Sequence, residues 1–235
     1  MSLPGQRVAM ISGASRGIGK AVALHLREGG WALSLGAREP DAIHPALAGE
    51  GMLRCPFDAT DRTSERRWAE ATAACFGRID ALVLNAGIMV PKSAVEVGDD
   101  ELDALLEVNL KSPLRLARAA WPHLAASGAG RIVTLVSLSG KRVKRAQSGA
   151  YSISKFAALG LAHALRHAGF EAGIRSTALC PGFVATDMAA ALTALPPEAM
   201  TQPHEIARIV ALLLDLPNTA SVAEVPVNCL LEEAF

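Results

Sequence analysis

Short apolar runs alternate with longer helical stretches along this chain, and the alternation constrains the fold more than any other feature. Strand-like length and composition occur at residues 7–12, 31–37, 51–56, 79–85, 130–137, 174–179 and 223–229. Helical character lies between them, near residues 18–29, 61–76, 99–126, 150–170 and 203–215. Strands that alternate with helices predict a parallel sheet with helices on both faces.

Several of these runs, such as VAMI, ALVL and RIVTLV, are apolar throughout, which is typical of strands covered on both faces. No repeat, low-complexity stretch or linker divides the 235 residues, a length that fits one large domain. We therefore expect an α/β fold, a Rossmann-like doubly wound sheet of about seven parallel strands, in a single domain over residues 1–235. Ligands of such sheets bind at the carboxyl ends of the strands, where the strand order reverses.

Charge and cysteine content exclude several classes of partner. Lys plus Arg equals Asp plus Glu at 23 each, whereas a nucleic-acid binder usually carries a basic surplus. The four cysteines are far apart and form neither a CxxC pair nor a zinc spacing, which favours a reducing compartment. The first residues have no signal-peptide pattern, and no apolar run is long enough to span a bilayer. We expect a cytoplasmic protein that binds neither nucleic acid nor membrane.

The first strand is followed by the glycine-rich segment SGASRGIG at residues 12–19, which opens a helix. Glycine lets the backbone turn tightly and approach a ligand closely. The helix N-terminus offers free N–H groups and a partial positive charge. Turns need glycine in any case, but this position between a strand and a helix predicts a dinucleotide site.

The end of the second strand bears on the choice of nicotinamide cofactor. NAD-binding folds place an acidic residue there to bind the ribose 2′-OH. Here that position is Ala37, and Arg38 follows it, while Arg16 lies inside the glycine-rich segment. Two guanidinium groups would suit a 2′-phosphate, so NADP(H) is favoured over NAD(H). Alternatively, both arginines are ordinary surface residues, and Glu39 could pair with Arg38.

The sequence YSISK at residues 151–155 begins a predicted helix, so Tyr151 and Lys155 share one helix face. A phenol of pKa near 10 is a poor acid or base at neutral pH. A cation about 4 Å away could contribute about 4 kcal/mol at an effective dielectric of about 20. We therefore expect Lys155 to lower the pKa of Tyr151, the only tyrosine in the chain, into a range useful for proton exchange.

Two further residues add to this pair. Ser137 ends the preceding strand, where its hydroxyl can face the same cleft and orient a substrate oxygen, although Ser139 is a rival for that role. Asn109 stands four residues before Pro113, which has no N–H, so the carbonyl of Asn109 loses its usual helical partner. The freed carbonyl could anchor a proton relay towards Lys155, or the proline could simply kink the helix.

Together these motifs resemble the short-chain dehydrogenase/reductase family in its compact single-domain form. The resemblance runs over nearly the whole chain: SGASRGIG at 12–19, Asp58 in FDATD, NAG at 85–87, Asn109 in VNL, Ser137, YSISK at 151–155 and PGFVATDM at 181–188. Several motifs in order, at matching distances, are far more specific than any one of them. The segment AEVPVNCLLEEAF at 223–235 departs from the glycine-rich turn that often ends the family, which puts its usual tetramer contact in doubt.

The resemblance implies a role for each matching position. Tyr151 would be the catalytic acid/base, Lys155 would hold the nicotinamide ribose, and Ser137 would position the substrate oxygen. Asn109 would anchor a water relay. The remaining positions would bind the cofactor: Gly13, Ser15, Arg16, Gly17, Ile18 and Gly19 its pyrophosphate, Arg38 its 2′-phosphate, Asp58 its adenine, Asn85, Ala86 and Gly87 its ribose, and Pro181, Gly182, Val184 and Thr186 its nicotinamide carboxamide.

Other features carry weaker expectations. His163 and His167 have a metal-like spacing but lack the HExxH pattern, so we expect an ordinary helix face and no metal. The basic run at 141–145 lies beside the predicted cleft and would suit an anionic substrate, although charge runs are usually solvated. Residues 187–202 would form a small substrate lid. Apolar helices at 102–126 and 156–168 suggest a homodimer or homotetramer.

The function that these expectations favour is an NADP(H)-dependent oxidoreductase that interconverts a carbonyl and an alcohol of a small molecule by hydride transfer. A non-catalytic NADP(H)-binding sensor or scaffold could be built on the same fold. An epimerase or dehydratase with tightly held NAD would need a larger substrate domain than this chain has room for. The intact set of Ser, Tyr, Lys and Asn speaks for the enzyme, because a sensor needs no tuned phenol.

Overall fold

The computed structural model describes residues 5–231, so the outermost residues of the predicted domain, 1–4 and 232–235, lie outside it. Seven strands form one sheet in the order β3-β2-β1-β4-β5-β6-β7, and every neighbouring pair is parallel. The strands are β1 (Val8–Ser12), β2 (Ala32–Ala37), β3 (Met52–Pro56), β4 (Ala81–Leu84), β5 (Arg131–Leu135), β6 (Arg175–Pro181) and β7 (Glu224–Val227). The Rossmann-like sheet predicted from the alternation is thereby confirmed.

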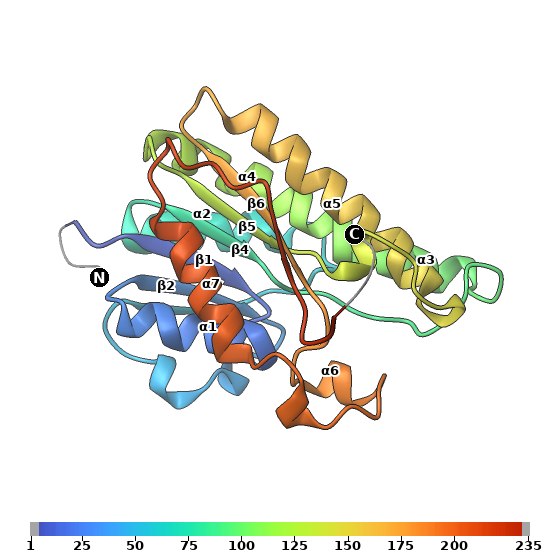
Figure 1. Cartoon of the computed structure of the whole chain (residues 1–235). Coiled ribbons are helices and arrows are strands. Elements are labelled where there is room, and N and C mark those ends of the chain that lie inside the picture. The colour runs from blue at the N-terminus through green and yellow to red at the C-terminus, as the bar shows by residue number, and fades with distance from the viewer. Residues whose placement is uncertain (1–4, 232–235) are drawn as a thin grey trace.

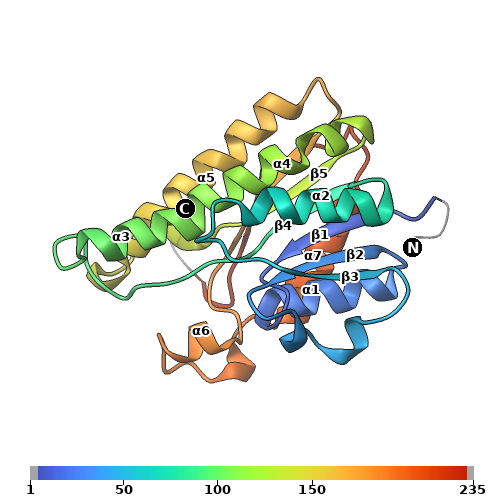
Figure 2. The same cartoon turned by 180° about the vertical axis from the view of Figure 1, so that it is seen from behind.

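Helices cover both faces of this sheet (Figures 1 and 2). The helices are α1 (Gly17–Glu28), α2 (Ser64–Phe76), α3 (Asp99–Leu106), α4 (Ser112–Ala126), α5 (Gly149–Gly169), α6 (Asp187–Ala190) and α7 (Pro203–Asp215). One apolar cluster joins α1 and α7 to one face, and a second joins α2, α4 and α5 to the other. Among the described residues, no helix is long and apolar enough to cross a membrane.

Burial explains why the central strands read as continuous apolar runs. Every residue of β1, β2, β4 and β5 is buried, because helices cover both sides of each strand. The edge strand β7 is only partly buried and carries a charged residue and a proline, which suits an edge. The strand order reverses between β1 and β4, and the loops that leave the carboxyl ends of these strands meet there.

The predicted helix over residues 99–126 is interrupted. A π-helical turn, Glu107–Lys111, separates α3 from α4, and the N–H of Ser112 bonds the carbonyl of Glu107, five residues back. Pro113 lies in the first turn of α4 and cannot donate to the carbonyl of Asn109. The slip to a five-residue spacing follows from that missing donor, and such turns are frequent at functional sites.

Candidate active site

The glycine-rich loop between β1 and α1 closes tightly on itself. Gly13 has φ +70° and Gly17 φ +54°, conformations that favour glycine. A Cβ on Gly19 would lie 2.2 Å from the carbonyl oxygen of Gly13, so a larger residue there would push the loop apart. The N-cap residue Arg16 makes no side-chain hydrogen bond to the first turn of α1. The backbone N–H groups of this turn therefore suit an anionic pyrophosphate.

The loop after β4 is bonded directly to this phosphate loop. The Oγ of Ser12 accepts from the N–H of Asn85 at 2.9 Å and of Ala86 at 3.0 Å. In return, Nδ2 of Asn85 donates to the carbonyls of Ser12 at 2.9 Å and Gly13 at 3.2 Å. The resemblance assigned Asn85 to the cofactor ribose; here its amide holds the two loops together. Sequence reasoning did not assign Ser12 a role, although its place directly before Gly13 at a strand end was a signal.

The end of β2 carries the residues expected to select the cofactor. Ala37 is buried where NAD-binding folds place an acid, and Arg38 beside it is exposed. Among the described residues, no ion pair joins Arg38 to Glu39. Arg16, in contrast, has an unforeseen partner: its Nη1 lies 3.4 Å from Oδ2 of Asp187, at the start of α6, and both side chains are mostly exposed. An exposed pair of this kind is weak enough to exchange for another anion.

Asp58 follows the carboxyl end of β3. Its Oδ1 accepts from the N–H of Thr60 at 2.9 Å and from the Thr60 hydroxyl at 2.8 Å. Its own N–H donates to the hydroxyl of Ser64 at 3.0 Å, at the start of α2. These bonds fix the direction of the carboxylate and leave Oδ2 without a hydrogen bond to any described residue, which suits an acceptor for an adenine amino group.

Tyr151 and Ser137 meet at the carboxyl end of β5. The hydroxyl of Ser137 hydrogen-bonds the phenol of Tyr151, which lies in the first turn of α5. Ser137 has φ +154° and ψ +158°, a backbone region that is almost restricted to glycine. It is the one described residue other than glycine with positive φ. Its Oγ also accepts from the N–H of Ser139 at 3.0 Å, so Ser139 supports Ser137 with its backbone rather than replacing it.

The expected effect of Lys155 on the phenol is not observed in the protein alone. Burial raises the pKa of Tyr151 to about 12, against a smaller opposing effect of the Ser137 hydrogen bond. Burial likewise lowers the pKa of Lys155 to about 8. The Nζ of Lys155 donates to the carbonyl of Leu135 at 2.9 Å. The prediction that the lysine lowers the tyrosine pKa is therefore wrong for the ligand-free protein, because burial raises this pKa and Lys155 is not among the groups that lower it.

Asn109 lies in the π-helical turn and is buried, and its side chain joins three segments. Its Oδ1 accepts from the N–H of Ile88, and its Nδ2 donates to the carbonyl of Ile88, both at 2.9 Å. Nδ2 also donates to the hydroxyl of Ser154 at 2.9 Å, one residue before Lys155. A Cβ on Gly87 would lie 3.2 Å from Oδ1 of Asn109 and 3.7 Å from Nζ of Lys155, so the loop after β4 passes close to both. Sequence reasoning considered the Asn109 carbonyl and missed Ser154.

The segment after β6 reaches back to the phosphate loop. Gly182 follows Pro181 and lies against Asn228, whose Oδ1 would be 2.6 Å from a Cβ on this glycine. Val184 forms an isolated bridge with Thr201, which pins both ends of the predicted lid over residues 187–202. The methyl group of Thr186 would be 3.3 Å from a Cβ on Gly17. The structure thus brings Thr186, one of the predicted nicotinamide-side residues, next to the phosphate loop.

Two residues of the basic run over residues 141–145 have partners within the protein. The ammonium of Lys141 forms a short ion pair with Oε2 of Glu224 in β7, and Nη1 of Arg142 donates to the carbonyl of Leu138 at 3.2 Å. His163 bonds the other oxygen of Glu224 at 2.7 Å. Lys141 thus holds the loop after Ser137 to the edge strand, and the expected anionic substrate stays a prediction.

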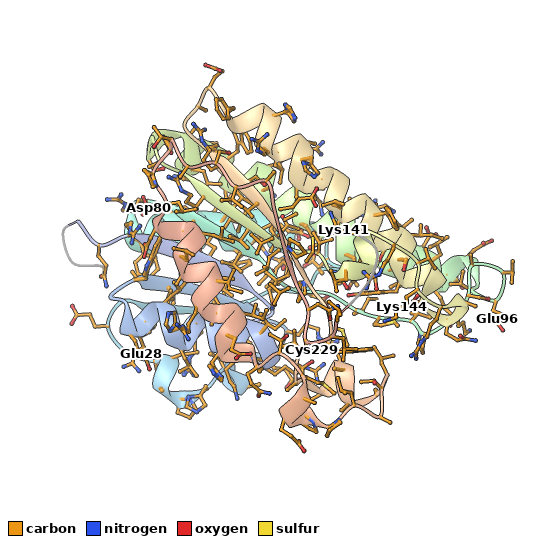
Figure 3. All side chains as sticks on the ribbon, viewed as in Figure 1. Glu28, Asp80, Glu96, Lys141, Lys144 and Cys229 are labelled. Carbon is orange, nitrogen blue, oxygen red and sulfur yellow. The ribbon has the colours of Figure 1, made fainter. Side chains whose placement is uncertain are left out.

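A cavity of about 410 Å³ lies next to Asp80, at the amino ends of the strands. Figure 3 labels Asp80 there and Cys229 at the carboxyl ends, where the candidate site lies. Arginines line it, but their donors are used within the protein. Arg131 donates to the carbonyl of Leu216 at 2.6 Å, just beyond α7, and Arg7 forms an ion pair with Asp215 at 2.5 Å. These arginines satisfy helix C-termini. The cavity is therefore separate from the chemistry described above.

The chain is similar in sequence to a known enzyme family and to several of its members. A family model described as short chain dehydrogenase matches residues 7–196. Agropine synthesis reductase of Rhizobium rhizogenes is 37% identical over 96% of the chain, which spans about half (53%) of that relative's length. Acetoacetyl-CoA reductase of Shinella zoogloeoides is 31% identical over 88% of the chain and 90% of that relative.

Solved structures agree with the fold. An alcohol dehydrogenase from the archaeon Thermococcus sibiricus, complexed with 5-hydroxy-NADP, has a TM-score of 0.85 and 31% identity, covering 94% of this chain and 96% of that one. A 3-ketoacyl-(acyl-carrier-protein) reductase from Brucella melitensis, complexed with NADH, has a TM-score of 0.87 at 24% identity, covering 95% and 97%. The chain belongs to the short-chain dehydrogenase family.

Proposed function

We propose that this protein is an NADP(H)-dependent oxidoreductase that interconverts a carbonyl and an alcohol by hydride transfer, with Tyr151 as the acid/base. The observation that carries the proposal is the hydrogen bond between the hydroxyls of Ser137 and Tyr151, with Nζ of Lys155 5.6 Å from the phenol ring. Two hydroxyls at one point form a donor pair for a carbonyl oxygen. The phosphate loop lies at the same edge of the sheet.

The residues present fit a dinucleotide. A Cβ at Gly19 would close the cradle against Gly13, and the first turn of α1 has N–H groups free for a pyrophosphate. Asp58 would hold the adenine, and Arg38 with Arg16 the 2′-phosphate. Asn85, Ala86 and Gly87 would line the cofactor ribose, and Lys155 would hold the nicotinamide ribose. Pro181, Gly182, Val184 and Thr186 would hold the carboxamide.

The cofactor supplies the hydride in reduction and accepts it in oxidation. In reduction, Ser137 donates a hydrogen bond to the substrate oxygen, and Tyr151 transfers its phenolic proton to that oxygen. The raised pKa keeps the phenol protonated at neutral pH, which suits the acid role. Lys155 and Asn109 would return a proton to the phenol. In oxidation, the same phenol must first lose its proton, and Lys155 provides the nearby positive charge that favours this loss.

The preference for NADP(H) rests on three features. Ala37 leaves no carboxylate at the ribose, Arg38 is exposed, and the exposed pair of Arg16 with Asp187 can exchange for a phosphate. The alcohol dehydrogenase from Thermococcus sibiricus was complexed with an NADP derivative. The measurement is kcat/KM for NADPH and for NADH. Arg38→Ala should lower only the NADPH value, about five- to thirtyfold for a lost charged contact of about 1–2 kcal/mol.

The decisive test is turnover of carbonyl substrates by the wild type and by Tyr151→Phe. A panel of ketones, aldehydes and acyl thioesters should include one that consumes NADPH with equal formation of alcohol. Tyr151→Phe should retain NADPH binding and lose turnover. Tight NADPH binding without turnover of any substrate would instead favour the sensor or scaffold on the same fold.

A preference for anionic substrates is a narrower proposal. Lys141 already pairs with Glu224, so the charge next to the cleft must come from elsewhere in the basic run. Charge reversal at Arg142 should raise KM for acidic substrates and leave KM for neutral ones unchanged; an equal effect on both contradicts it.

We also propose a homodimer or homotetramer, since Ile153 and Phe156 on α5 are exposed apolar residues, and sedimentation velocity would determine the mass.

A further inference from the structure

Arg115 on α4 bridges three segments at the nucleotide end of the site. Its Nη2 donates to the carbonyl of Ala59 at 3.1 Å and to Oε1 of Glu65 at 2.9 Å. Its Nη1 lies 2.7 Å from Oε1 of Glu107. A planar guanidinium with several donors can hold three partners at once, which an ammonium cannot do in the same geometry.

Two of these partners adjoin residues of the proposed site. Ala59 directly follows Asp58, the expected adenine acceptor. Glu107 opens the π-helical turn and stands two residues before Asn109. On the inner side of that turn, Asn109 is bonded to Ile88 and Ser154. On the outer side, Arg115 contacts Glu107. One side chain therefore holds both the loop next to the nucleotide and the turn that carries the relay asparagine.

The cluster joins α2 to α4 through buried charged groups, whose removal from water has a free-energy cost. The Glu65 side chain is only 1% exposed, and its Oε2 has no hydrogen-bond partner among the described residues. The Nε of Arg115 is likewise buried without a partner. Replacing such buried ion pairs with apolar residues is often neutral or stabilising. A costly polar cluster between two functional segments therefore invites a functional explanation.

We propose that Arg115 is a positioning residue that couples the nucleotide loop at Asp58 to the π-helical turn that carries Asn109. The inference rests on the proposed function, since it assigns those two ends their roles. Its consequence is that one substitution at Arg115 weakens binding of the adenine half and slows the step that needs Asn109, although Arg115 touches neither cofactor nor substrate.

The test uses Arg115→Lys, which keeps the charge but cannot span three partners. Two quantities are measured: the Kd for 2′-phospho-ADP, which lacks nicotinamide, and kcat at saturating NADPH and carbonyl substrate. We expect each to worsen about three- to thirtyfold, the range of typical coupling between sites. The matched control is Arg118→Lys on the exposed side of the same helix, which should leave both quantities unchanged.

A second variant controls for unfolding of the protein by a buried charge that has lost its partner. Arg115→Met combined with Glu65→Gln and Glu107→Gln removes all three of these charges together. The other cationic partners of Glu107, Lys111 and Arg62, have side chains that are 46% and 78% exposed, so water solvates them in this variant. Wild-type values of both quantities in this folded triple variant would overturn the proposal. A loss of affinity with unchanged kcat would also overturn it, because Arg115 would then hold only the nucleotide loop. A wild type that binds 2′-phospho-ADP but never turns over would contradict the proposed function instead, with the Kd comparison still measurable.

Discussion

The Nζ of Lys155 lies 5.6 Å from the centroid of the Tyr151 ring, one turn further along α5. At this distance the lysine is a neighbour of the phenol and not its hydrogen-bond partner. The ammonium of Lys155 donates a hydrogen bond to the carbonyl of Leu135, and the phenol is hydrogen-bonded to Ser137. The two groups therefore titrate in opposite directions from their ordinary values, because burial penalises the charged form of each.

The chain has one tyrosine, so the tyrosinate absorbance near 295 nm reports Tyr151 alone. We expect the ligand-free protein to titrate with a midpoint near 12. Ser137→Ala should raise the midpoint further, since the Ser137 hydrogen bond favours the phenolate. Circular dichroism at each pH checks that the protein stays folded. A midpoint below 10 in the folded wild type would show that Lys155 already dominates.

Lys155 should make stability depend on pH in a defined direction. Its pKa is lowered in the folded state to about 8, so the stability present above pH 10.5 is lost as the pH falls towards 8. The loss is about 3 kcal/mol, because one pKa unit corresponds to about 1.4 kcal/mol. In urea unfolding, the free energy of unfolding of Lys155→Met should therefore rise relative to that of the wild type as the pH falls from 10 to 7. An equal difference at both pH values contradicts the burial effect.

Ser154 should matter through Asn109. Ser154→Ala removes one acceptor of the Asn109 amide and should cost about 1 kcal/mol of stability, a typical hydrogen-bond contribution. It should also lower kcat about five- to tenfold, on the same scale, with unchanged NADPH affinity. Ser152→Ala, two residues earlier, is the control, because the Ser152 hydroxyl is buried and has no hydrogen-bond partner among the described residues. Equal effects of the two variants would assign the loss to packing in α5.

Gly19→Ala should disable the phosphate loop. Its Cβ would lie 2.2 Å from the carbonyl of Gly13 and 2.6 Å from the Asn85 amide, so the loop must open. We expect NADPH binding to weaken by at least a hundredfold, equivalent to about 3 kcal/mol. Gly160→Ala on α5 meets no described atom within 4 Å beyond the backbone of its own helix and should raise stability by about 0.5–1 kcal/mol. Isothermal titration and thermal unfolding of both variants compare the two effects.

Local pattern was enough to predict the sheet, because its central strands are buried on both faces and read as apolar runs. The seven predicted runs each contain or overlap one observed strand. The π-helical turn before α4 was not predicted, because the missing N–H of Pro113 indicated only a lost helical bond or a kink. The short helix α6 was not predicted, since four residues carry too little periodicity. The glycine positions of the phosphate loop were also readable, because a tight turn between strand and helix demands them.

What the sequence by itself determined is the order of elements and the identity of the groups at the carboxyl edge, since both follow from short-range spacing. What only the tertiary structure decided is what each group touches. Arg16 meets Asp187 from a segment 171 residues away, and Lys141 meets Glu224 from 83 away. The tyrosine pKa was misjudged for the same reason: i, i+4 spacing reveals a nearby charge, whereas desolvation depends on every element packed around the phenol.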